Sequence, residues 1–302
     1  MIVAPRARRS RWVASALCSL VVTFVVVTVG SGTAVAADPH ADRRVTTWAR
    51  ASSATITPGV MMYTAGAQCT SNFVFTDSSG GVYVGYAAHC AGRGGATDTN
   101  GCKVGSVRLG TKVTFNDGGS LLGEGTRVGR GVLAYSSWIT EKKLHTTHAN
   151  TCAYNDLALV KVSRRDVKKV NPSVPFWGGP TGIDTNGLSA GDRVFTYGNS
   201  SLRAGLSPLS PHTGIGIGDL ATDGGWSHPL YTVLPGVPGD SGSGFLSERG
   251  LAIGTLSTIG LAPLPLSNNI GDLAKELAFA RAHSGISGLR LAKGTAPFSP
   301  IL

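Results

Sequence analysis

Three side chains, far apart in the sequence, have the types needed to activate a hydroxyl group as a nucleophile. His89 follows small residues at the end of a strand-like run, Asp156 precedes an apolar run, and Ser241 lies in Gly239-Asp240-Ser241-Gly242. A histidine can take the proton of a serine hydroxyl, and a carboxylate can orient the imidazole and stabilise its cation. Together, the three residues predict acyl transfer by a serine nucleophile.

Each of these residues alone has a simpler interpretation. A glycine-rich turn around Ser241, a polar histidine at a strand end and a turn-forming aspartate before a strand are all common. Ser241 is also not in the Gly-x-Ser-x-Gly elbow of α/β-hydrolases, because Ser243 occupies the last position. His89 differs from an ordinary polar residue because Cys90 follows it, and a disulfide there would hold the imidazole in place for proton transfer.

The first 36 residues are typical of a secretory signal peptide. Four arginines precede a mostly apolar stretch from Trp12 to Val29, and Ala34-Val35-Ala36 forms a small-x-small cleavage site. We therefore expect cleavage before Ala37 and a secreted, extracellular protein. The Arg8-Arg9 pair leaves the twin-arginine route open. An uncleaved membrane anchor is the alternative, because the apolar stretch approaches the length that spans a bilayer.

The composition excludes several other classes of protein. With 42 glycines among 302 residues and only 15% charged residues, the chain favours short strands and tight turns over a helical bundle. The leader holds four of the 27 basic residues, so 23 remain against 17 acidic ones. They occur as pairs such as Lys142-Lys143, without the long runs of nucleic-acid binders. We expect a monomer with no nucleic-acid partner and, after signal cleavage, no membrane partner.

The cysteine count predicts disulfides. Removal of the leader leaves an even set of four: Cys69, Cys90, Cys102 and Cys152. In an oxidising compartment four cysteines allow three different pairings. His145 and His148 form an isolated HxxH pair that we interpret as a surface feature rather than a metal site. We expect no metal and no other cofactor.

Strand-like runs recur at short intervals along the chain, and clusters of turn-forming residues separate them. They cover 60–64, 72–76, 82–86, 112–115, 132–138, 157–162, 193–197, 230–234, 244–247 and 251–257. Residues 171–175 contain two prolines and lack periodicity, which suits a connector between two halves. The pattern predicts an all-β protein.

A single helix is predicted near the C-terminus. Ile270, Leu273, Ala274 and Leu277 recur at helical spacing. Asn268 or Asn269 could cap the start of this helix, and Gly285 lies beyond its end. The helix should close the fold.

The order His89, Asp156, Ser241 is similar to that of the chymotrypsin-like (trypsin-like) serine peptidases, specifically their secreted bacterial members. The matching segments are Ala87-Ala88-His89-Cys90, Asp156-Leu157-Ala158-Leu159, Gly239-Asp240-Ser241-Gly242 and Gly254-Thr255-Leu256-Ser257. The resemblance extends from about residue 56 to 283. It implies two chymotrypsin-like six-stranded β-barrels packed face to face, with a C-terminal α-helix.

The resemblance divides the chain into five segments. They are a signal peptide (1–36), a short leader or propeptide (37–57), an N-terminal barrel (58–170), a C-terminal barrel (171–266) and a helix with a tail (267–302). It implies that the first barrel carries His89 and Asp156, and that the second carries Ser241. The backbone N–H groups of Gly239 and Ser241 match the oxyanion hole. It also implies a bridge between Cys69 and Cys90 that closes the histidine loop and, with it, the pairing of Cys102 with Cys152.

Activation by a new N-terminus, as in many relatives, is not expected. No Arg precedes an Ile-Val-Gly-Gly segment before the first predicted strand. Another cation should then hold Asp240. Arg193 and Arg203 are candidates because both lie in the second half, although a solvated surface position is the more ordinary one for either.

The substrate pocket implied by the resemblance lacks charge. Six residues before Ser241, where relatives that cleave after Arg or Lys have an acid, this chain has Pro235, and neither Gly236 nor Val237 supplies one. Ser257 matches a pocket-wall residue that binds substrate backbone, and Ile259 lies where many relatives have glycine. We expect cleavage after small or medium apolar residues. Cleavage after basic residues would need an acid from another loop, such as Asp219 or Asp223.

The resemblance thus implies a secreted serine endopeptidase that acts on peptides or proteins through an acyl-enzyme intermediate. A secreted esterase or other acyl hydrolase with the same triad is the first alternative. A non-catalytic protease-like binding protein is the second, although it would not need His89, Asp156 and Ser241 together.

Overall fold

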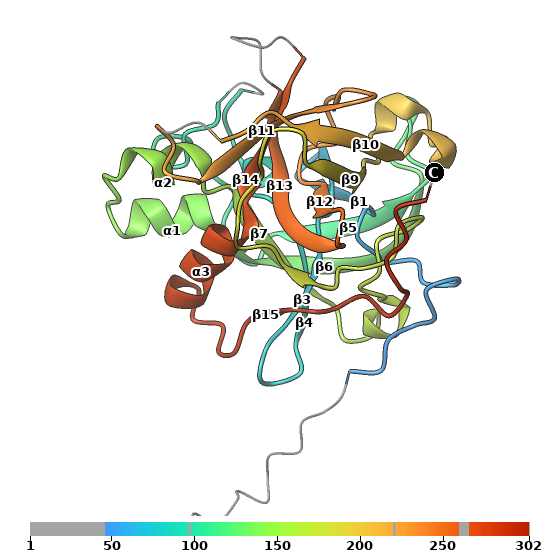
Figure 1. The fold of residues 1–302 in the computed structure, drawn as a ribbon. Coiled ribbons are helices and arrows are strands. Elements are labelled where there is room, and N and C mark those ends of the chain that lie inside the picture. The colour runs from blue at the N-terminus through green and yellow to red at the C-terminus, as the bar shows by residue number, and fades with distance from the viewer. Residues whose placement is uncertain (1–45, 96–97, 220–221, 260–265, 302) are drawn as a thin grey trace, which may run out of the picture. The chain divides into compact units, whose positions relative to one another are not determined.

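Two β-sheets account for most of the structure, shown in Figure 1. The computed structural model describes residues 46–95, 98–219, 222–259 and 266–301. The predicted signal peptide and residues 37–45 of the predicted leader therefore lie outside the described residues. None of the described helices is both long and apolar enough to cross a membrane.

The first sheet has eight strands in the order β15-β3-β4-β7-β6-β5-β1-β2, all antiparallel to their neighbours. Their bounds are β1 (Met61–Thr64), β2 (Ala67–Thr70), β3 (Val74–Thr76), β4 (Val82–Ala87), β5 (Lys112–Asp117), β6 (Thr126–Ser136), β7 (Leu157–Val162) and β15 (Arg290–Leu291). The sheet is open, because the strand pairing of the described residues ends at β15 and at β2.

The second sheet closes on itself. Its strands are β8 (Gly182–Ile183), β9 (Arg193–Tyr197), β10 (Pro211–Gly216), β11 (Ser227–Thr232), β12 (Gly244–Ser247), β13 (Leu251–Ile259) and β14 (Asn268–Asp272). The order β12-β9-β10-β11-β14-β13 becomes a ring of six because β12 also pairs with β13, and β8 adds to β13 in parallel. The chain is therefore mostly β, with one closed six-stranded barrel and one open sheet, where the resemblance implied two six-stranded barrels.

The helices are few and short. They are α1 (Ser137–Lys143), α2 (Ala149–Tyr154), α3 (Leu273–His283) and the 3₁₀ turns η1 (Ala88–Ala91), η2 (Val167–Lys169), η3 (Ser201–Arg203) and η4 (Ser207–Leu209). The predicted C-terminal helix is confirmed as α3, but it starts after Asn268 and Asn269. Asp272 caps it by accepting a hydrogen bond from the backbone of Lys275 at 2.7 Å. Gly285 follows its end with a φ of 71°.

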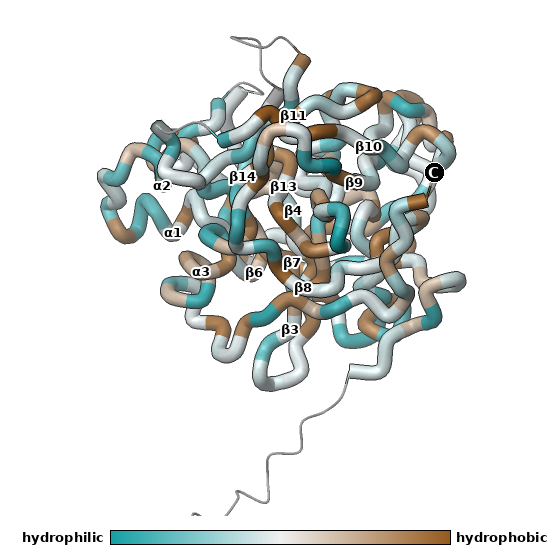
Figure 2. Tube along the Cα trace, in the orientation of Figure 1, coloured by the Kyte–Doolittle hydropathy of each residue, from teal (hydrophilic) through white to brown (hydrophobic). Residues whose placement is uncertain are grey.

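Burial on both faces of the strands explains the apolar runs in the sequence. In β7, Ala158 and Val160 face a core inside the first sheet, whereas Leu157 and Leu159 face a second core. That second core also contains residues from β9, β12, β13 and α3, so it joins the two sheets. A third core fills the closed barrel. Figure 2 shows apolar segments concentrated in central strands such as β4 and β13.

Compact structure begins earlier than the sequence indicated. Trp48 packs against the first core, and the N–H of Ala49 donates to the carbonyl oxygen of Val170 at 2.9 Å. Ile56 is fully buried and forms a parallel bridge with Val170. Residues 46–57, which the sequence assigned to a leader, therefore pack onto the first sheet.

Candidate active site

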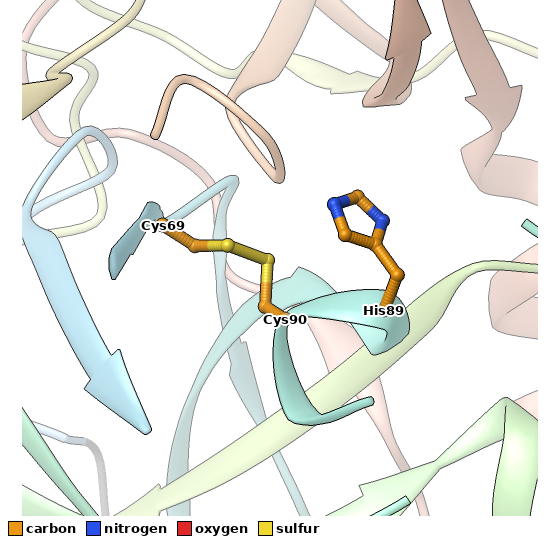
Figure 3. A group of neighbouring side chains, drawn as sticks. All are labelled: Cys69, His89 and Cys90. Atoms are coloured by element: carbon orange, nitrogen blue, oxygen red, sulfur yellow. A yellow bond between two sulfur atoms is a disulfide. The ribbon is translucent and has the colours of Figure 1, made fainter. Parts of the chain in front are cut away.

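His89 lies on η1, a single 3₁₀ turn directly after strand β4. The small side chains of Ala87 and Ala88 are fully buried, so the chain can turn there within the core. A disulfide between Cys69 on β2 and Cys90, with a Cα separation of 6.1 Å, ties this turn to the neighbouring strand. Figure 3 shows this disulfide beside the imidazole of His89. The covalent tie limits how far the imidazole can move.

The same two cysteines and His89 form a group with the spacing of a metal site. Metal binding requires thiolates, but these sulfur atoms are bonded to each other. The group is therefore an anchor for η1 and not a metal site. The second disulfide joins Cys102 to Cys152 within α2. These are the two pairings that the resemblance implied.

Asp156 is buried, and each of its polar groups has a partner. Its backbone carbonyl accepts from Ala88 N–H at 2.8 Å, and its Oδ1 accepts from His89 N–H at 2.8 Å. Its Oδ2 accepts from His89 Nδ1 and from the hydroxyl of Ser257, both at 2.6 Å. Two bonds to the carboxylate thus come from His89, one from its backbone and one from its ring.

This contact determines which nitrogen of His89 carries a proton. An ionised carboxylate only accepts hydrogen bonds, so Nδ1 must donate to Asp156 and Nε2 of the neutral ring keeps a lone pair. Burial lowers the pKa of His89, but the charge of Asp156 and the hydrogen bond to it outweigh burial and raise the pKa above its ordinary value. Nε2 can therefore accept a proton, and Asp156 stabilises the resulting cation.

Ser241 lies in the turn before β12, partly exposed, and its backbone lies against the histidine turn. Its carbonyl oxygen accepts from the N–H of Thr70 at 2.9 Å and lies 3.9 Å from the Sγ of Cys90. Gly242 has a φ of 89°, and a Cβ there would lie 2.8 Å from the backbone nitrogen of Ala87. Only glycine permits this close approach. No hydrogen bond joins Ser241 to His89 within the part of the chain that the structure describes.

Strand β2 holds the turn that contains Ser241. Gly239 has a φ of 99°, and its carbonyl oxygen accepts from the hydroxyl of Thr70 at 2.8 Å and from the amide of Gln68 at 3.1 Å. Among the described residues, neither the N–H of Gly239 nor that of Ser241 donates to a protein acceptor. Both donors thus remain available to a ligand. Strand β2 was not predicted from the sequence, in which the only sign of its role is the cysteine at position 69.

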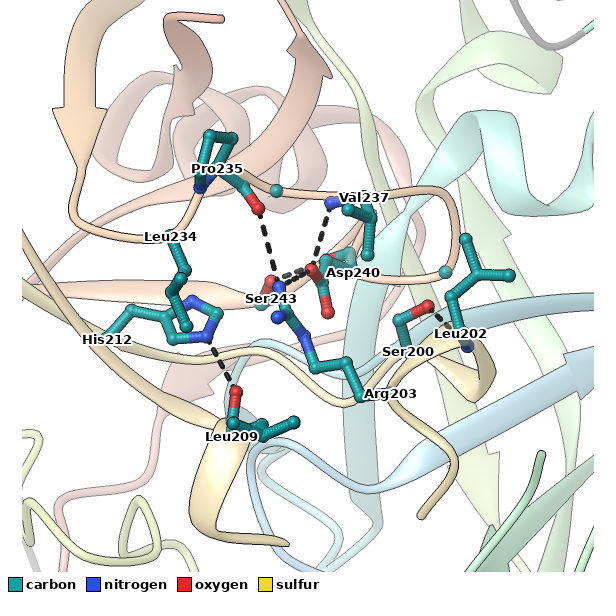
Figure 4. A network of polar contacts seen from close by, with 12 residues as sticks. Ser200, Leu202, Arg203, Leu209, His212, Leu234, Pro235, Val237, Asp240 and Ser243 are labelled. Carbon is teal, nitrogen blue, oxygen red and sulfur yellow. Dashed lines mark hydrogen bonds and ion pairs between the residues drawn. The ribbon is translucent and has the colours of Figure 1, made fainter. Parts of the chain in front are cut away.

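Asp240 forms a buried ion pair with Arg203. The Nη2 atom of Arg203 lies 2.6 Å from Oδ2 of Asp240, which also accepts from the N–H of Val237 at 3.0 Å. Figure 4 shows the guanidinium directed at this carboxylate and at the carbonyl oxygen of Pro235, 3.4 Å away. Of the two arginines suggested by the sequence, Arg203 is the partner, whereas Arg193 stacks over the ring of Phe195.

The residues expected to form the substrate pocket lie in one loop and on strand β13. Gly236 is buried, and its N–H donates to Oδ1 of the buried Asn268 at 3.1 Å. Pro235 and Val237 flank it, half-buried. Ser257 turns its hydroxyl toward Asp156. Ile259 ends β13, and its side chain lies outside what the structure describes.

Each of the two acids suggested for a basic-residue pocket has a hydrogen-bond partner elsewhere, but Oδ2 of Asp223 has none among the described residues. The carboxylate of Asp219 lies 2.6 Å from Nδ1 of His228, whose Nε2 lies 2.9 Å from Asp272. Asp223 is buried and accepts from the N–H of Gly225 at 2.7 Å. Of the HxxH pair, His148 caps α2 by accepting from the N–H of Thr151.

Two buried glutamates near Asp156, Glu141 and Glu276, were not predicted as site residues from the sequence. Burial, and then the charge of Asp156, raise the pKa of Glu141 to about 8. The same two causes raise the pKa of Glu276 well above its ordinary value. Glu276 had a recognisable signal, since it occupies the buried stripe of α3 together with Leu273, Leu277 and Ala280. An acid in an apolar stripe indicates a specific partner.

Only the comparison with solved structures finds proteins similar to this chain. No family model and no curated protein matches the chain. Thermobifida fusca protease A matches with a TM-score of 0.47 and 15% identity, covering 79% of this chain and 99% of that one. Nocardiopsis protease matches with a TM-score of 0.42 and 17% identity, covering 78% of this chain and 98% of that one. Cellulomonas bogoriensis chymotrypsin also matches with a TM-score of 0.42 and 17% identity, covering 79% of this chain and 98% of that one. Over about 78% of its length, the chain therefore has structural matches among bacterial chymotrypsin-like serine proteases.

Proposed function

We propose that this chain is a secreted serine endopeptidase of the chymotrypsin-like type. The observation that carries this proposal is the His89–Asp156 contact of 2.6 Å, completed by the hydroxyl of Ser257 and placed next to the turn of Ser241. Buried histidine and aspartate pairs also occur without catalysis. Here, however, the histidine has an available Nε2 and a partly exposed serine turn beside it.

In the proposed mechanism, Ser241 is the nucleophile. Its Oγ attacks the carbonyl carbon of a peptide bond while Nε2 of His89 takes the proton, and His89 then gives this proton to the leaving amine. Water releases the acyl group from Ser241 in a second cycle through the same imidazole. Asp156 holds the Nδ1–H tautomer and stabilises the imidazolium.

The N–H groups of Gly239 and Ser241 are the proposed oxyanion hole. They would stabilise the negative oxygen of the tetrahedral intermediate, at about 3 to 4 kcal/mol for each donor. The positive φ of Gly239 supports this role, because a Cβ there would collide with Oε1 of Gln68 and lie 2.8 Å from Oγ of Ser200, so this turn requires glycine. The bonds from Thr70 and Gln68 to the carbonyl oxygen of Gly239 would hold the turn in this orientation before substrate binds.

The proposed substrates are peptides or proteins, cleaved after small or medium apolar residues. Pro235, Gly236 and Val237, with Ser257 and Ile259, would form the pocket. The carboxylate nearest to this loop, that of Asp240, is already neutralised by Arg203. In the proposed architecture, residues 58–170 form most of the open sheet and residues 171–266 form most of the closed six-stranded barrel, which β14 (Asn268–Asp272) completes, and the two pack face to face.

Secretion as a monomer, after removal of residues 1–36, completes the proposal. The two disulfides support it, since such bridges form and persist in oxidising compartments. N-terminal sequencing of the protein from culture medium would locate the cleavage site.

A fluorophosphonate probe tests the proposed nucleophile directly. The probe should label one serine of the purified protein, and peptide mapping should identify it as Ser241. Ser241→Ala and His89→Ala variants, shown to be folded by circular dichroism, are the controls and should not be labelled. Labelling at another serine, or none at all, would reject the proposed triad. Turnover of matched ester and amide substrates would then separate an endopeptidase from an esterase.

A further inference from the structure

The backbone N–H of Asp156 donates to a side chain from the far end of the sequence. Its acceptor is Oε1 of Glu276, on the C-terminal helix α3, at 2.9 Å. Glu276 is fully buried on the face of α3 that also carries the buried apolar side chains of Leu273 and Leu277. Burial of a carboxyl group costs free energy unless its oxygens are hydrogen-bonded. The burial of Glu276 is therefore explained by the hydrogen bonds that its two oxygens accept.

The second oxygen of Glu276 is also bonded. Oε2 accepts from the hydroxyl of Thr255 at 3.2 Å, and this hydroxyl oxygen accepts from the amide of Asn72 at 3.1 Å. Thr255 lies on β13, two residues before Ser257, whose hydroxyl binds the carboxylate of Asp156. Strand β13 is thus linked to Asp156 twice, once directly through Ser257 and once through Thr255 and Glu276.

The local backbone leaves room for this carboxyl group. A Cβ at Gly271 would lie 2.5 Å from Oε1 of Glu276, which is closer than a real side chain allows. The charged or titratable groups that face Glu276 are Asp156, Asp272 and Tyr135. No ion pair to Glu276 is found within the described ranges. Burial and the charge of Asp156 both raise the pKa of Glu276, so they oppose a second negative charge beside Asp156.

We propose that Glu276 is a positioning residue, which holds the backbone of Asp156 from the C-terminal helix and thereby fixes the imidazole of His89. This inference rests on the proposed function. The bonds from Ser257 and His89 orient the carboxylate of Asp156, but none of them restrains its backbone nitrogen. Without Glu276, that N–H would be buried without an acceptor, and the start of β7 would shift to find one. A shift of about 1 Å in a catalytic group can lower turnover by about 100-fold.

Two substitutions at position 276 separate the effect of the hydrogen-bond acceptor from the effect of filling the space. Glu276→Gln keeps an oxygen acceptor of the same shape and should keep kcat within about threefold. Glu276→Leu fills similar space without an acceptor and should lower kcat by about 10- to 100-fold at nearly unchanged KM. Leu277→Ala on the same helix is the matched control. It should lower thermal stability without changing the pH profile of kcat/KM.

The pKa of His89 gives a second readout that does not depend on turnover. It should be followed by NMR titration of the imidazole in a Ser241→Ala background, with each variant at position 276. Gln should leave this pKa unchanged, and Leu should lower it as the contact with Asp156 weakens. If the wild-type protein cleaves no peptide, the proposed function fails, but the titration still decides the role of Glu276.

Three results would overturn the inference. The first is a wild-type kcat and a wild-type His89 pKa in Glu276→Leu. The second is a loss of kcat in Glu276→Gln as large as that in Glu276→Leu, and the third is a His89 pKa in Leu277→Ala that is lowered as much as in Glu276→Leu. If Glu276→Leu does not fold, Thr255→Val provides the test, because it removes the hydroxyl that donates to Oε2, together with the bond that this hydroxyl accepts from Asn72. It should lower kcat by several-fold and lower the His89 pKa in the same direction. An unchanged pKa and kcat in folded Thr255→Val would then reject the proposal.

Discussion

The guanidinium group of Arg203 lies 2.6 Å from the carboxylate of Asp240, the residue directly before Ser241. Both side chains are buried, with 10% and 2% of their areas exposed. The same carboxylate oxygen accepts from the N–H of Val237, and the same guanidinium contacts the carbonyl oxygen of Pro235. A single ion pair therefore connects η3 to both ends of the loop that precedes the proposed nucleophile.

Removal of this cation should disrupt the loop. Arg203→Met leaves the charge of Asp240 buried without a partner, which costs about 3 to 5 kcal/mol. We expect a loss of this order in the free energy of unfolding, measured by urea titration, and a fall in kcat/KM of at least about tenfold as the N–H groups of Gly239 and Ser241 lose their orientation. Arg193→Met, at an exposed arginine stacked on Phe195, is the matched control and should cost less than about 1 kcal/mol. Equal effects of the two substitutions would contradict the role of Arg203.

Activity should have an acid limb set by His89. The mechanism needs a neutral imidazole, and Asp156 raises the pKa of His89 above the ordinary 6.5. Protonation therefore begins at a higher pH than for a free histidine, and kcat/KM should fall as the pH drops through this raised pKa. In Asp156→Asn the limb should move to lower pH, and kcat should fall on the order of 10⁴-fold. An acid limb that does not move in this variant would show that another group controls it.

The sequence predicted the regular strands better than the irregular ones. The bounds of β7, β9 and β12 are confirmed as predicted, because apolar and β-branched residues fill these strands on both faces. Strand β10 starts at Pro211 and contains two glycines, so it carries no strand signal. Strand β14 is rich in Asn and Asp, which led us to expect a helix cap there, whereas its backbone pairs on both sides inside the barrel.

The polar residues around the site were harder to predict than the proposed triad. Asp156, His89 and Ser257 come together because η1, β7 and β13 meet, and each lies in a recognisable motif. Arg203 and Glu276 belong to no local motif, and their partners lie 37 and 120 residues away in the sequence. The apolar stripe of α3 marks Glu276 as unusual, but the identity of its partner depends on how the elements pack, so no local pattern shows it.

The two disulfides should differ in their effect on activity. Removal of either, as Cys69→Ala/Cys90→Ala or Cys102→Ala/Cys152→Ala, should lower the free energy of unfolding by about 3 to 4 kcal/mol. Only the first bridge anchors the turn that carries His89, so only the first double variant should also lose kcat at a temperature where both are folded. Linkage of Cys90 to Cys102 in non-reducing peptide mapping, or equal losses of kcat, would contradict this assignment.

The proposed pocket should reject basic residues. A buried Arg or Lys side chain without a carboxylate costs several kcal/mol, whereas an apolar side chain gains about 25 cal/mol for each Å² that it buries. Asp240 cannot serve as the counter-ion, because Arg203 already neutralises it. A peptide-library digest analysed by mass spectrometry should show cleavage after Ala, Val, Leu or Met. Dominant cleavage after Arg or Lys would mean that an acid reaches the pocket from elsewhere.

The most direct test of the proposed function is the turnover of a peptide amide by the wild-type protein and by Ser241→Ala. Both should fold alike, since Ser241 is partly exposed and the substitution removes only a hydroxyl group. We predict that the wild-type protein cleaves the peptide and that Ser241→Ala loses about 10⁶-fold in kcat, because no other group in the site can form the acyl intermediate. Near-native amide hydrolysis by folded Ser241→Ala would contradict the account.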